Sequence, residues 1–401
     1  MKDSTVFSAL DDSTTVNSVL GLRLDQLRAS GGLATAEEIG RQPALWRQLP
    51  GIVQAQAAQI EAGLEPFRRH RDLRIVLTGA GTSAFIGHVL APALTRQTGR
   101  RVDAIATTDL VSNPGSYLAE DRPTLLVSFA RSGDSPESTA ATQLADQYLT
   151  ECRHLVLTCN PDGALARQHD GSDRSLVLTM PAAANDTGFA MTSSFTCMTL
   201  SALLVLAPEL LPSGAVELLA TSAEQTLLTG GERASQLTGR GFQRVVYLGS
   251  GPLKGLAQES ALKMLELTAG QVATWHDSPL GFRHGPKAVI DERTLVIVHV
   301  SADPYTRRYD WDMITELRAS MDPSSVIAIT GSVAPDRGDP SSVRPPMDDL
   351  DDAARSVVLI LPAQILALHH SLALGLTPDN PFPSGAVNRV VEGVTIHPHQ
   401  R

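Results

Sequence analysis

The chain has 401 residues, of which 42% are hydrophobic and 19% are charged, and these fractions are typical of a soluble globular protein. Its length predicts about two to three domains. The formal net charge of −10 excludes a general nucleic-acid-binding surface, because phosphate contacts need a basic stripe and the sequence contains none.

Residues 1–70 are predicted to form an N-terminal helical segment, because apolar residues recur at helical spacing between Thr35 and Arg69. The polar N-terminus contains no apolar run long enough for a signal peptide. Nowhere does the chain contain an uninterrupted apolar stretch of about 18 residues, so we expect no membrane span. The sequence therefore predicts a cytoplasmic protein that binds neither a membrane nor nucleic acid.

Residues 71–213 are predicted to form a first α/β domain. Helices are expected after Thr82, after Pro136 and across 190–207. The three cysteines of the chain lie in this region, have no metal-ligand spacing and are expected to be free buried thiols. Short runs rich in valine, isoleucine and leucine predict buried parallel strands at 74–78, 102–106, 124–129, 154–158 and 175–179.

Residues 214–376 are predicted to form a second domain of the same kind, which begins with a helix at 214–238. The Pro-, Asp- and Ser-rich stretch 331–352 is predicted to be an exposed loop. Residues 377–401 are expected to be an irregular tail over the active site. Strands are expected near 244–248, 294–300, 325–330 and 356–360.

The two halves share one plan. Residues 72–91 and 242–261 each predict an apolar strand, a tight Gly-x-Gly turn and a helix. Alternating strands and helices in both halves predict an α/β protein with two tandem, doubly wound parallel sheets, each a flavodoxin-like αβα sandwich. A hydroxyl-rich loop occurs only in the first half, and a Glu/Lys/His group only in the second, so one half is expected to hold a ligand and the other to act on it.

Two loops of the first half are candidates for binding a phosphate group. The run GAGTSA at 79–84 matches a dinucleotide fingerprint, but no ribose-binding acid follows about 20 residues later. The run SFARSGDSPES at 128–138 places Ser132, Gly133 and Ser135 before a helix, where backbone N–H groups bind anions. Helix capping alone is the alternative explanation for these hydroxyls. Two such turns at the carboxyl edge of one sheet favour a ligand, and the absence of a Walker motif favours a monophosphate.

The candidate catalytic group lies in the second half. Glu259, Lys263 and Glu266 have i, i+4 and i+7 spacing, so they share one helix face. A solvated row of ion pairs is the alternative explanation. The segment that follows contains His276 and His284 between glycines and prolines, which is typical of a functional loop.

The motifs TGAGTS, SFARSGDS, ESALKMLE and FRHGP together resemble the sugar isomerase (SIS) domain family. The pairing of two such domains resembles the isomerase half of glucosamine-6-phosphate synthase. The runs MTSSFT, SPLGFRHGP and PDNPFPSGAVNRVV are similar to the tagatose-6-phosphate ketose/aldose isomerase group, whose members are understood as galactosamine-6-phosphate deaminase/isomerases. The resemblance covers roughly residues 50–401.

The resemblance implies the roles of individual residues. Glu266 is expected to be the general base that moves a proton between C1 and C2, and His284, lent by a neighbouring subunit, to assist ring opening. Glu259 and Lys263 are expected to support the base or contact the substrate. The expected substrate-binding residues are Gly81, Thr82, Ser83, Arg131, Ser132, Gly133, Ser135, Thr192, His276 and Asn388.

Two departures from the synthase affect these expectations. The spacing from Glu266 to His284 is longer by two residues, so His276 is a competing candidate for ring opening. Arg131 replaces a glutamine of the synthase and is expected to add a charged phosphate contact. The chain also has no N-terminal glutaminase domain, which favours release of ammonia over its consumption.

The sequence therefore predicts an enzyme, an amino-sugar phosphate deaminase/isomerase that converts galactosamine 6-phosphate to tagatose 6-phosphate and ammonia. The alternatives are an aldose–ketose isomerase that does not release ammonia and a non-catalytic sugar-phosphate sensor. Neither a metal nor an organic cofactor is expected, because proton transfer next to a carbonyl needs only a positioned carboxylate and a group that exchanges protons near pH 7. The expected partners are a small sugar phosphate and further copies of the chain, as a homodimer or a dimer of dimers with shared active sites.

Overall fold

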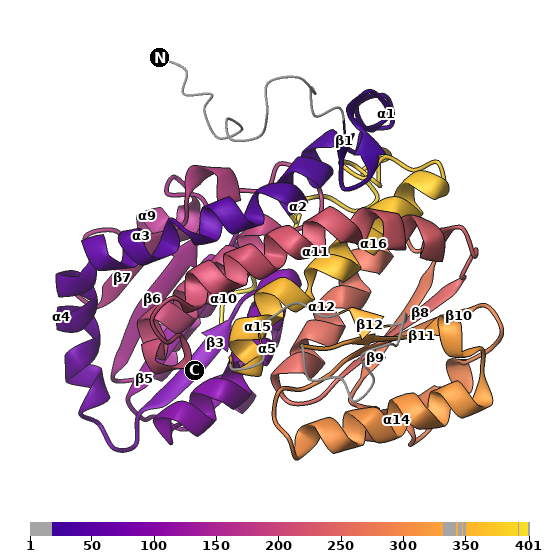
Figure 1. Ribbon diagram of the computed structural model, residues 1–401. Coiled ribbons are helices and arrows are strands. Elements are labelled where there is room, and N and C mark those ends of the chain that lie inside the picture. Colours follow the sequence, from indigo (N-terminus) through magenta and orange to yellow (C-terminus); the bar gives the residue numbers. More distant parts are fainter. Residues whose placement is uncertain (1–17, 332–341, 344–346, 348–349, 392, 400–401) are drawn as a thin grey trace.

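Two five-stranded parallel sheets form the frame of the protein (Figure 1). The computed structural model describes residues 18–331, 342–343, 347, 350–391 and 393–399. The first sheet has the order β4-β3-β5-β6-β7. Its strands are β3 (Arg74–Thr78), β4 (Arg101–Ala104), β5 (Thr124–Ala130), β6 (Cys152–Thr158) and β7 (Ser175–Thr179).

The second sheet has the order β12-β11-β10-β8-β9. If the five strands of each half are numbered 1 to 5 along the chain, both sheets have the strand order 2-1-3-4-5. This is the flavodoxin-like order, which confirms the predicted fold class. The strands of the second sheet are β8 (Arg244–Gly249), β9 (Ala273–Asp277), β10 (Thr294–His299), β11 (Val326–Ile329) and β12 (Ser342–Val343).

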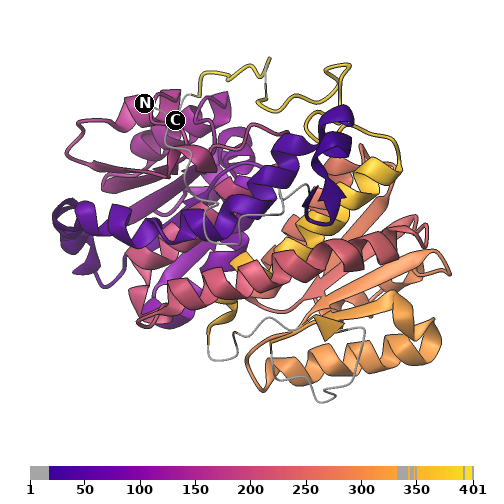
Figure 2. The ribbon, with the colours of Figure 1, turned by 45° about the horizontal axis from the view of Figure 1, so that its top comes forward.

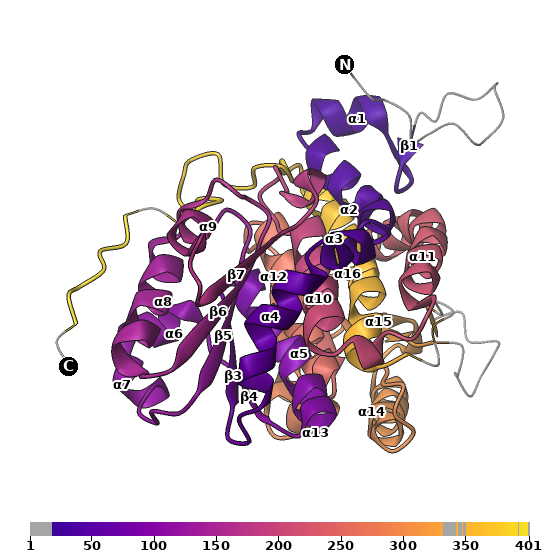
Figure 3. The ribbon, with the colours of Figure 1, turned by 90° about the vertical axis from the view of Figure 1, so that its left-hand side faces the viewer.

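A layer of buried helices separates the two sheets (Figures 1 and 3). Because these helices face sheets or other helices on several sides, their buried residues join in one large apolar cluster. The layer consists of α5 (Thr82–Thr98), α10 (Ser193–Leu206), α12 (Pro252–Leu267), α15 (Asp352–Leu359) and α16 (Leu361–Ala373), and α2 (Leu33–Trp46) and α11 (Ala215–Thr238) cover it.

The outer faces of the sheets carry the remaining helices, which Figure 3 shows for the first sheet and Figure 1, with α14, for the second. Those over the first sheet are α6 (Thr107–Ser112), α7 (Pro114–Tyr117), α8 (Pro136–Tyr148) and α9 (Ala164–His169). Those over the second sheet are α13 (Pro279–Phe282) and α14 (Thr306–Ser320). The N-terminal segment contains a hairpin of β1 (Ser18–Val19) and β2 (Leu22–Arg23), followed by α1 (Leu24–Ala29), α2, α3 (Leu49–Ala55) and α4 (Ala57–Arg68).

One predicted strand is wrong. Residues 356–359 belong to α15, and Ile360 joins α15 to α16. Asp351 starts α15 by accepting a hydrogen bond from the backbone N–H of Ala353. The run SVVLIL is apolar without alternation, because this helix is buried on all sides, and such a run cannot distinguish a buried helix from a buried strand. The helical stretch Asp352–Ala373 is long and apolar enough to cross a membrane, but 83% of its apolar window is buried inside the protein, so it is a core helix.

Two further expectations need correction. Strand β9 was not predicted, because it is a short edge strand whose Trp275 is 48% exposed and whose sequence shows no apolar alternation. Most of the predicted loop 331–352 lies outside the described residues. Within it, Ser342–Val343 form β12, and Met347 and Leu350 are buried rather than exposed.

The C-terminal tail ties the two ends of the chain together. The carboxylate of Asp379 accepts hydrogen bonds from the backbone N–H groups of Ala34 (3.1 Å) and Thr35 (2.7 Å), in the first turn of α2. Figure 2 shows the tail beside these N-terminal helices and then along the first half of the protein. The predicted tail is therefore irregular but anchored at its start.

Helices α5 and α12 approach each other unusually closely at Gly255. A Cβ atom at this position would lie 2.6 Å from the backbone carbon of His88 and 2.6 Å from the backbone nitrogen of Val89. A backbone cannot give way as a flexible side chain does, so only glycine fits here. This contact fixes the position of one helix relative to the other.

Gly255→Ala should destabilise the protein by about 1–3 kcal/mol, because the added methyl group forces the two helices apart. Urea denaturation measures the loss. Gly63→Ala is the matched control, since Gly63 also lies in a helix, α4, and its Cβ would meet nothing within 4 Å. The control should be neutral or stabilise by roughly 0.5–1 kcal/mol. Equal stabilities for the two variants would contradict the close approach.

Candidate active site

Three ionisable side chains of α12 and one threonine of α5 form a continuous network between these helices. The ammonium of Lys263 lies 2.7 Å from Glu266 Oε2, 3.3 Å from Glu259 Oε1 and 2.9 Å from Thr82 Oγ1. The hydroxyl of Thr82 lies 3.3 Å from Glu259 Oε1 and donates to it. The expected common face of Glu259, Lys263 and Glu266 therefore exists. It faces the first candidate ligand loop, residues 79–84 of the other domain, rather than solvent.

The exposure of the three ionisable groups differs. The side chains of Lys263 and Glu259 are fully buried, whereas 23% of the Glu266 side chain is exposed. A buried row of charges excludes the alternative of a solvated ion-pair stripe on the helix surface. Glu266 is the member of the network that a substrate can reach.

Burial and charge act in opposite directions on this network. Burial raises the pKa of Glu259 to about 8, although the charge of Lys263 lowers it and that of Glu266 adds to the rise. Burial alone would lower the pKa of Lys263, but the two carboxylates outweigh it and raise that pKa. Lys263 therefore stays charged, and the pKa of Glu259 lies close to neutral pH.

The first ligand loop ends β3 and begins α5. Gly81 has φ +55°, a conformation that side-chain-bearing residues rarely adopt, and it starts the helix without any side-chain cap. The hydroxyl of Ser83 contacts the sulfur of Met191 at 3.8 Å. Thr78, the last residue of β3, pairs in register with Ser128 of β5, and the hydroxyls of both are buried without a hydrogen-bond partner among the described residues. These free hydroxyls suit a polar ligand.

The hydroxyl of Thr107 is also buried without a hydrogen-bond partner among the described residues, and this residue is not one of the predicted site residues. Thr107 begins α6, and its backbone N–H donates to the carbonyl of Gly79 in the first ligand loop. The sequence offered one indication of this role, a threonine shortly after β4, where the next helix begins.

The second ligand loop ends β5 and begins α8. Gly133 has φ +71°, and the backbone carbonyl of Ser132 accepts a hydrogen bond from the side-chain amide of Asn160 at 2.9 Å. Ser135 occupies the N-cap position of α8, yet its hydroxyl makes no hydrogen bond to the helix backbone and donates to the carboxylate of Glu137. Helix capping therefore does not explain the hydroxyl of Ser135.

Arg131 lies beside these loops and holds the C-terminal tail. Its two terminal nitrogens donate to the backbone carbonyls of Phe189 (3.0 Å) and Arg389 (2.7 Å). Burial, with the charge of Arg389, lowers the pKa of Arg131, while Asp186 and Glu266 raise it. The charge of Glu266 thus affects the pKa of Arg131, so the two residues lie near each other. Both terminal nitrogens of Arg131 already donate hydrogen bonds to backbone carbonyls.

The loop before α10 depends on two buried acids that sequence reasoning missed. Asp186 accepts hydrogen bonds from the backbone N–H groups of Thr192 (2.8 Å), Ser193 (3.1 Å) and Ser194 (2.9 Å). Glu38 accepts from the backbone of the adjacent residues 187–188. Thr192, a predicted phosphate ligand, donates its hydroxyl to Asp186 at 3.2 Å. Its visible role is therefore to hold the loop.

The family model of the SIS domain matches residues 69–207 and 240–335, more than half of the chain. The chain belongs to the SIS domain family. A protein from Streptomyces coelicolor is 57% identical over 90% of this chain and 95% of its own length. D-galactosamine-6-phosphate deaminase AgaS of Escherichia coli is 48% identical over 93% of this chain and 97% of its own length.

A solved structure agrees with this assignment. The crystal structure of tagatose-6-phosphate ketose/aldose isomerase from Escherichia coli superposes with a TM-score of 0.83 and 45% sequence identity, covering 93% of this chain and 99% of that chain. The resemblance expected from the motifs, two SIS domains of the tagatose-6-phosphate isomerase and galactosamine-6-phosphate deaminase group, is confirmed.

Within one SIS chain, His276 is far from Glu266. Burial lowers the pKa of His276, and the charges of Lys254 and His88 add to this effect while that of Asp277 opposes it. The effect of Lys254 on this pKa shows that His276 lies near Lys254. Lys254 lies in the first turn of α12, and Glu266 lies 12 residues further on, at about 1.5 Å per residue. His276 therefore lies near the opposite end of this helix from the predicted base.

His284 and Glu266 lie on opposite faces of the second sheet. Helix α13, which precedes His284, packs onto the face that contains Val246, whereas α12 packs onto the face that contains Tyr247. The side chain of His284 is exposed. The sheet separates the two residues within one chain. Asn388 is likewise exposed, on the tail.

One group of potential metal ligands lies elsewhere in the first SIS domain. Single ligand atoms of Asp146, Cys152 and His154 lie within 4.8 Å of one another. His154 Nε2 already pairs with Asp146 Oδ1 at 3.1 Å, and burial raises the pKa of the Cys152 thiol to about 12. Metal binding needs the thiolate, which this raised pKa disfavours. The expectation that the protein requires no metal stays a prediction.

Glu259→Gln should make the stability of the protein less dependent on pH. Because the pKa of Glu259 is about 8 in the folded protein and 4.5 in its usual state, the folded wild type binds the extra proton, and its unfolding free energy falls as pH rises between these values. The stability of the variant relative to the wild type should therefore rise from pH 5 to pH 8, by at most about 1.4 kcal/mol per pH unit.

Urea denaturation of both proteins at several pH values measures this difference. Glu292→Gln is the control, because it removes a carboxylate whose side chain is 85% exposed. Parallel pH profiles for Glu259→Gln and the wild type would disprove the raised pKa.

Proposed function

We propose that this protein converts galactosamine 6-phosphate and water to tagatose 6-phosphate and ammonia. The observation that carries the proposal is the buried network of Glu259 and Lys263, which presents the partly exposed Glu266 beside a ligand loop. Relatives named D-galactosamine-6-phosphate deaminase that are 44–48% identical over at least 93% of this chain support the choice of substrate.

The chemistry follows from the position of Glu266. The ligand loops around Ser83 and Ser132 hold the phosphate group of the open-chain sugar by hydroxyls and helix N-termini. Glu266 removes the proton from C2 and returns it to C1, through an enediol-type intermediate that bears nitrogen at C2. The resulting imine at C2 takes up water and loses ammonia, so one water is consumed for each ammonia released. By this balance the reaction is a hydrolytic deamination.

Lys263 acts on the base rather than on the sugar in this scheme. Its ammonium donates a hydrogen bond of 2.7 Å to Glu266 Oε2, which fixes the orientation of this carboxylate. Thr82 links Lys263 to the first turn of α5, where the phosphate is held. The phosphate site and the base are therefore joined through one buried side chain.

Aldose–ketose isomerisation without ammonia release is the second candidate. The structural relative from Escherichia coli that is named tagatose-6-phosphate ketose/aldose isomerase favours it. The same C1/C2 proton transfer by Glu266 serves both reactions, and only the substituent at C2 differs. A non-catalytic sensor has no use for a buried Glu259 beside a partly exposed base, so it is the weakest candidate.

The proposed enzyme is a cytoplasmic homodimer, or a dimer of dimers, that uses neither a metal nor an organic cofactor. Its active sites are shared between subunits. The separation of His284 from Glu266 by the second sheet supports this arrangement, because a histidine that opens the sugar ring at Glu266 must then come from a neighbouring chain.

Ammonia release from galactosamine 6-phosphate tests the proposed function. Glucosamine 6-phosphate and N-acetylgalactosamine 6-phosphate are assayed in parallel, and ammonia from the first substrate alone is the expected result. Conversion of tagatose 6-phosphate to an aldose phosphate, with no ammonia from any amino sugar, would favour the isomerase instead.

Glu266→Gln should lower kcat by about 100- to 10,000-fold, because an amide cannot accept the C2 proton. Binding of the sugar phosphate, measured by calorimetry, should change little. Glu292→Gln, which alters an exposed carboxylate, should keep wild-type turnover. Unchanged turnover in Glu266→Gln would remove Glu266 from the role of base.

Mixing two inactive variants tests the shared site. Glu266→Gln and His284→Asn chains, unfolded and refolded together, should regain activity, because a mixed dimer contains one site with both native residues. Each variant refolded alone should stay inactive. Absence of activity in the mixture, with dimers present, would show that both residues act within one chain.

A further inference from the structure

The loop at residues 186–192, which precedes α10, contacts both candidate ligand loops. The hydroxyl of Ser83, in the first ligand loop, donates to the sulfur of Met191 at 3.8 Å. A terminal nitrogen of Arg131, the first residue after β5, donates to the backbone carbonyl of Phe189 at 3.0 Å. The position of loop 186–192 therefore affects both places where the substrate phosphate is expected.

Arg389 of the C-terminal tail bonds to this loop and to Arg131. Its guanidinium donates to the backbone carbonyl of Asp186 and, at 3.3 Å, to that of Gly188. The backbone carbonyl of Arg389 accepts a hydrogen bond from the second terminal nitrogen of Arg131 at 2.7 Å. One tail residue thus joins loop 186–192, through its side chain, to the start of the second ligand loop, through its backbone.

The tail makes two further contacts with the same loop. The backbone N–H of Phe189 donates to the carbonyl of Asp379 at 3.1 Å, and the ring centroids of Phe189 and Phe382 lie 5.1 Å apart. The carboxylate of Asp379 is itself bonded to α2. Because these contacts do not involve the Arg389 side chain, a variant that lacks this side chain should keep the tail near the loop and should fold.

The charge of Arg131 is buried and is not neutralised by an ion pair. Arg131 is 7% exposed, and its terminal nitrogens donate to backbone carbonyls. No ion pair of Arg131 occurs in the part of the chain that the structure describes, and Asp186 and Glu266 interact with its charge from beyond ion-pair distance. A buried cation is unfavourable unless an anion compensates its charge. Arg131 therefore favours an anion at the second ligand loop.

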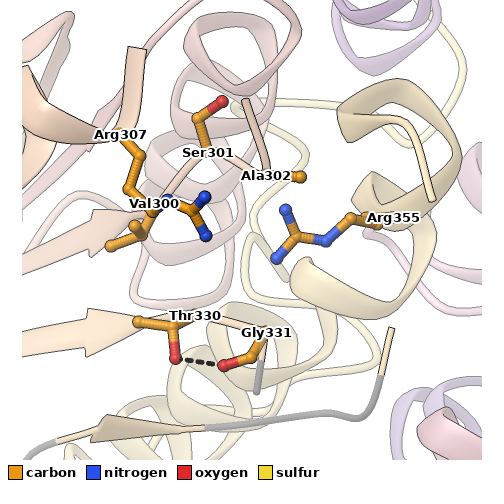
Figure 4. A pocket seen from close by; sticks show the side chains of 7 residues that line it. All are labelled: Val300, Ser301, Ala302, Arg307, Thr330, Gly331 and Arg355. Carbon is orange, nitrogen blue, oxygen red and sulfur yellow. Dashed lines mark hydrogen bonds between the residues drawn. The ribbon is translucent and has the colours of Figure 1, made fainter. Parts of the chain in front are cut away.

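The second SIS domain treats a buried arginine differently. Arg355 is 1% exposed and forms an ion pair of 2.8 Å with Asp352. Figure 4 shows Arg355 beside a small hollow at the ends of β10 and β11. The hollow has a volume of about 10 Å³, which is room for about one water molecule. The uncompensated arginine of the first domain is thus the better candidate for recognising a phosphate group.

We propose that Arg389 is a positioning residue for binding of the substrate phosphate, because it holds Arg131 at the second ligand loop. The proposal rests on the proposed function in taking a sugar phosphate as the ligand. Arg389 acts through Arg131 and does not touch the sugar. Removing its side chain should therefore weaken phosphate binding and leave the proton transfer by Glu266 unchanged.

A double-mutant cycle on the full-length protein tests this role, with the Kd of tagatose 6-phosphate measured by calorimetry. Arg389→Ala should raise Kd by about 5- to 30-fold, the loss expected when one charge-assisted contact is misplaced. Arg131→Ala should raise it at least as much. If Arg389 acts through Arg131, the double variant should bind as weakly as Arg131→Ala alone. Additive losses, or an unchanged Kd in either single variant, would overturn the proposal.

Turnover separates positioning from a general structural role. Arg389→Ala should raise KM for galactosamine 6-phosphate and keep kcat within about twofold of the wild type, as expected when only binding is lost. A fall in kcat at unchanged KM would contradict the proposal. Val391→Ala is the control, because Val391 is a tail residue that is 50% exposed, and it should match the wild type in Kd and KM.

The binding cycle does not depend on ammonia release. If no amino sugar yields ammonia, the proposed function fails, while the Kd values still decide the role of Arg389. An unchanged Kd in Arg389→Ala, with normal ammonia release, would overturn the positioning role and leave the proposed function standing. Absence of tagatose 6-phosphate binding by the wild type would overturn this proposal together with the phosphate site that it serves.

Discussion

The ion pairs of Lys263 are the interaction on which the rest of the site depends. A fully buried ammonium is tolerated only where neighbouring groups compensate its charge and accept its hydrogen bonds, and here Glu266 and the carboxyl group of Glu259 surround it from the same helix face. The hydrogen bond from Lys263 to Thr82 extends this network into the other SIS domain. Burial of the network is possible because Gly255 lets α12 lie directly on the backbone of α5. Packing between the domains thus places the proposed base, Glu266, next to the proposed phosphate loop.

The two SIS domains show how one backbone plan supports different roles. Both have the same strand order and nearly the same glycine turn at Gly81 and Gly251. The first domain leaves its hydroxyls available at the carboxyl edge of the sheet, whereas the second fills the same edge with Asp310 and Asp352. In the second domain, the carboxylates of Asp310 and Asp352 thus accept the backbone N–H groups of Ser301 and Ala302. They stabilise the loop after β10 from within the protein. The difference lies in side chains rather than in the fold.

Sequence patterns predicted most of the frame and the central network, for identifiable reasons. The strand at 74–78 and the glycine turn that follows it are local signals, and the spacing of Glu259, Lys263 and Glu266 determines a common helix face. The helix at 356–359 was missed because a fully buried helix has no periodicity. The relation of His284 to Glu266 depends on which face of a sheet each helix covers. That relation is tertiary, and local sequence does not encode it.

The anchoring of the tail has a consequence for how the protein is made. Asp379 holds the first turn of α2, and the carbonyl of Arg389 accepts a hydrogen bond from Arg131 beside the ligand loop. Asp379 and Arg389 follow both sheets in the sequence, so they are synthesised after them. The first domain can therefore form its sheet during translation, when the N-terminal part is already free to fold, but its ligand loop gains these contacts only after residues 379–389 have been synthesised. A chain that stops before residue 379 lacks these two contacts, one of which lies beside the proposed phosphate site.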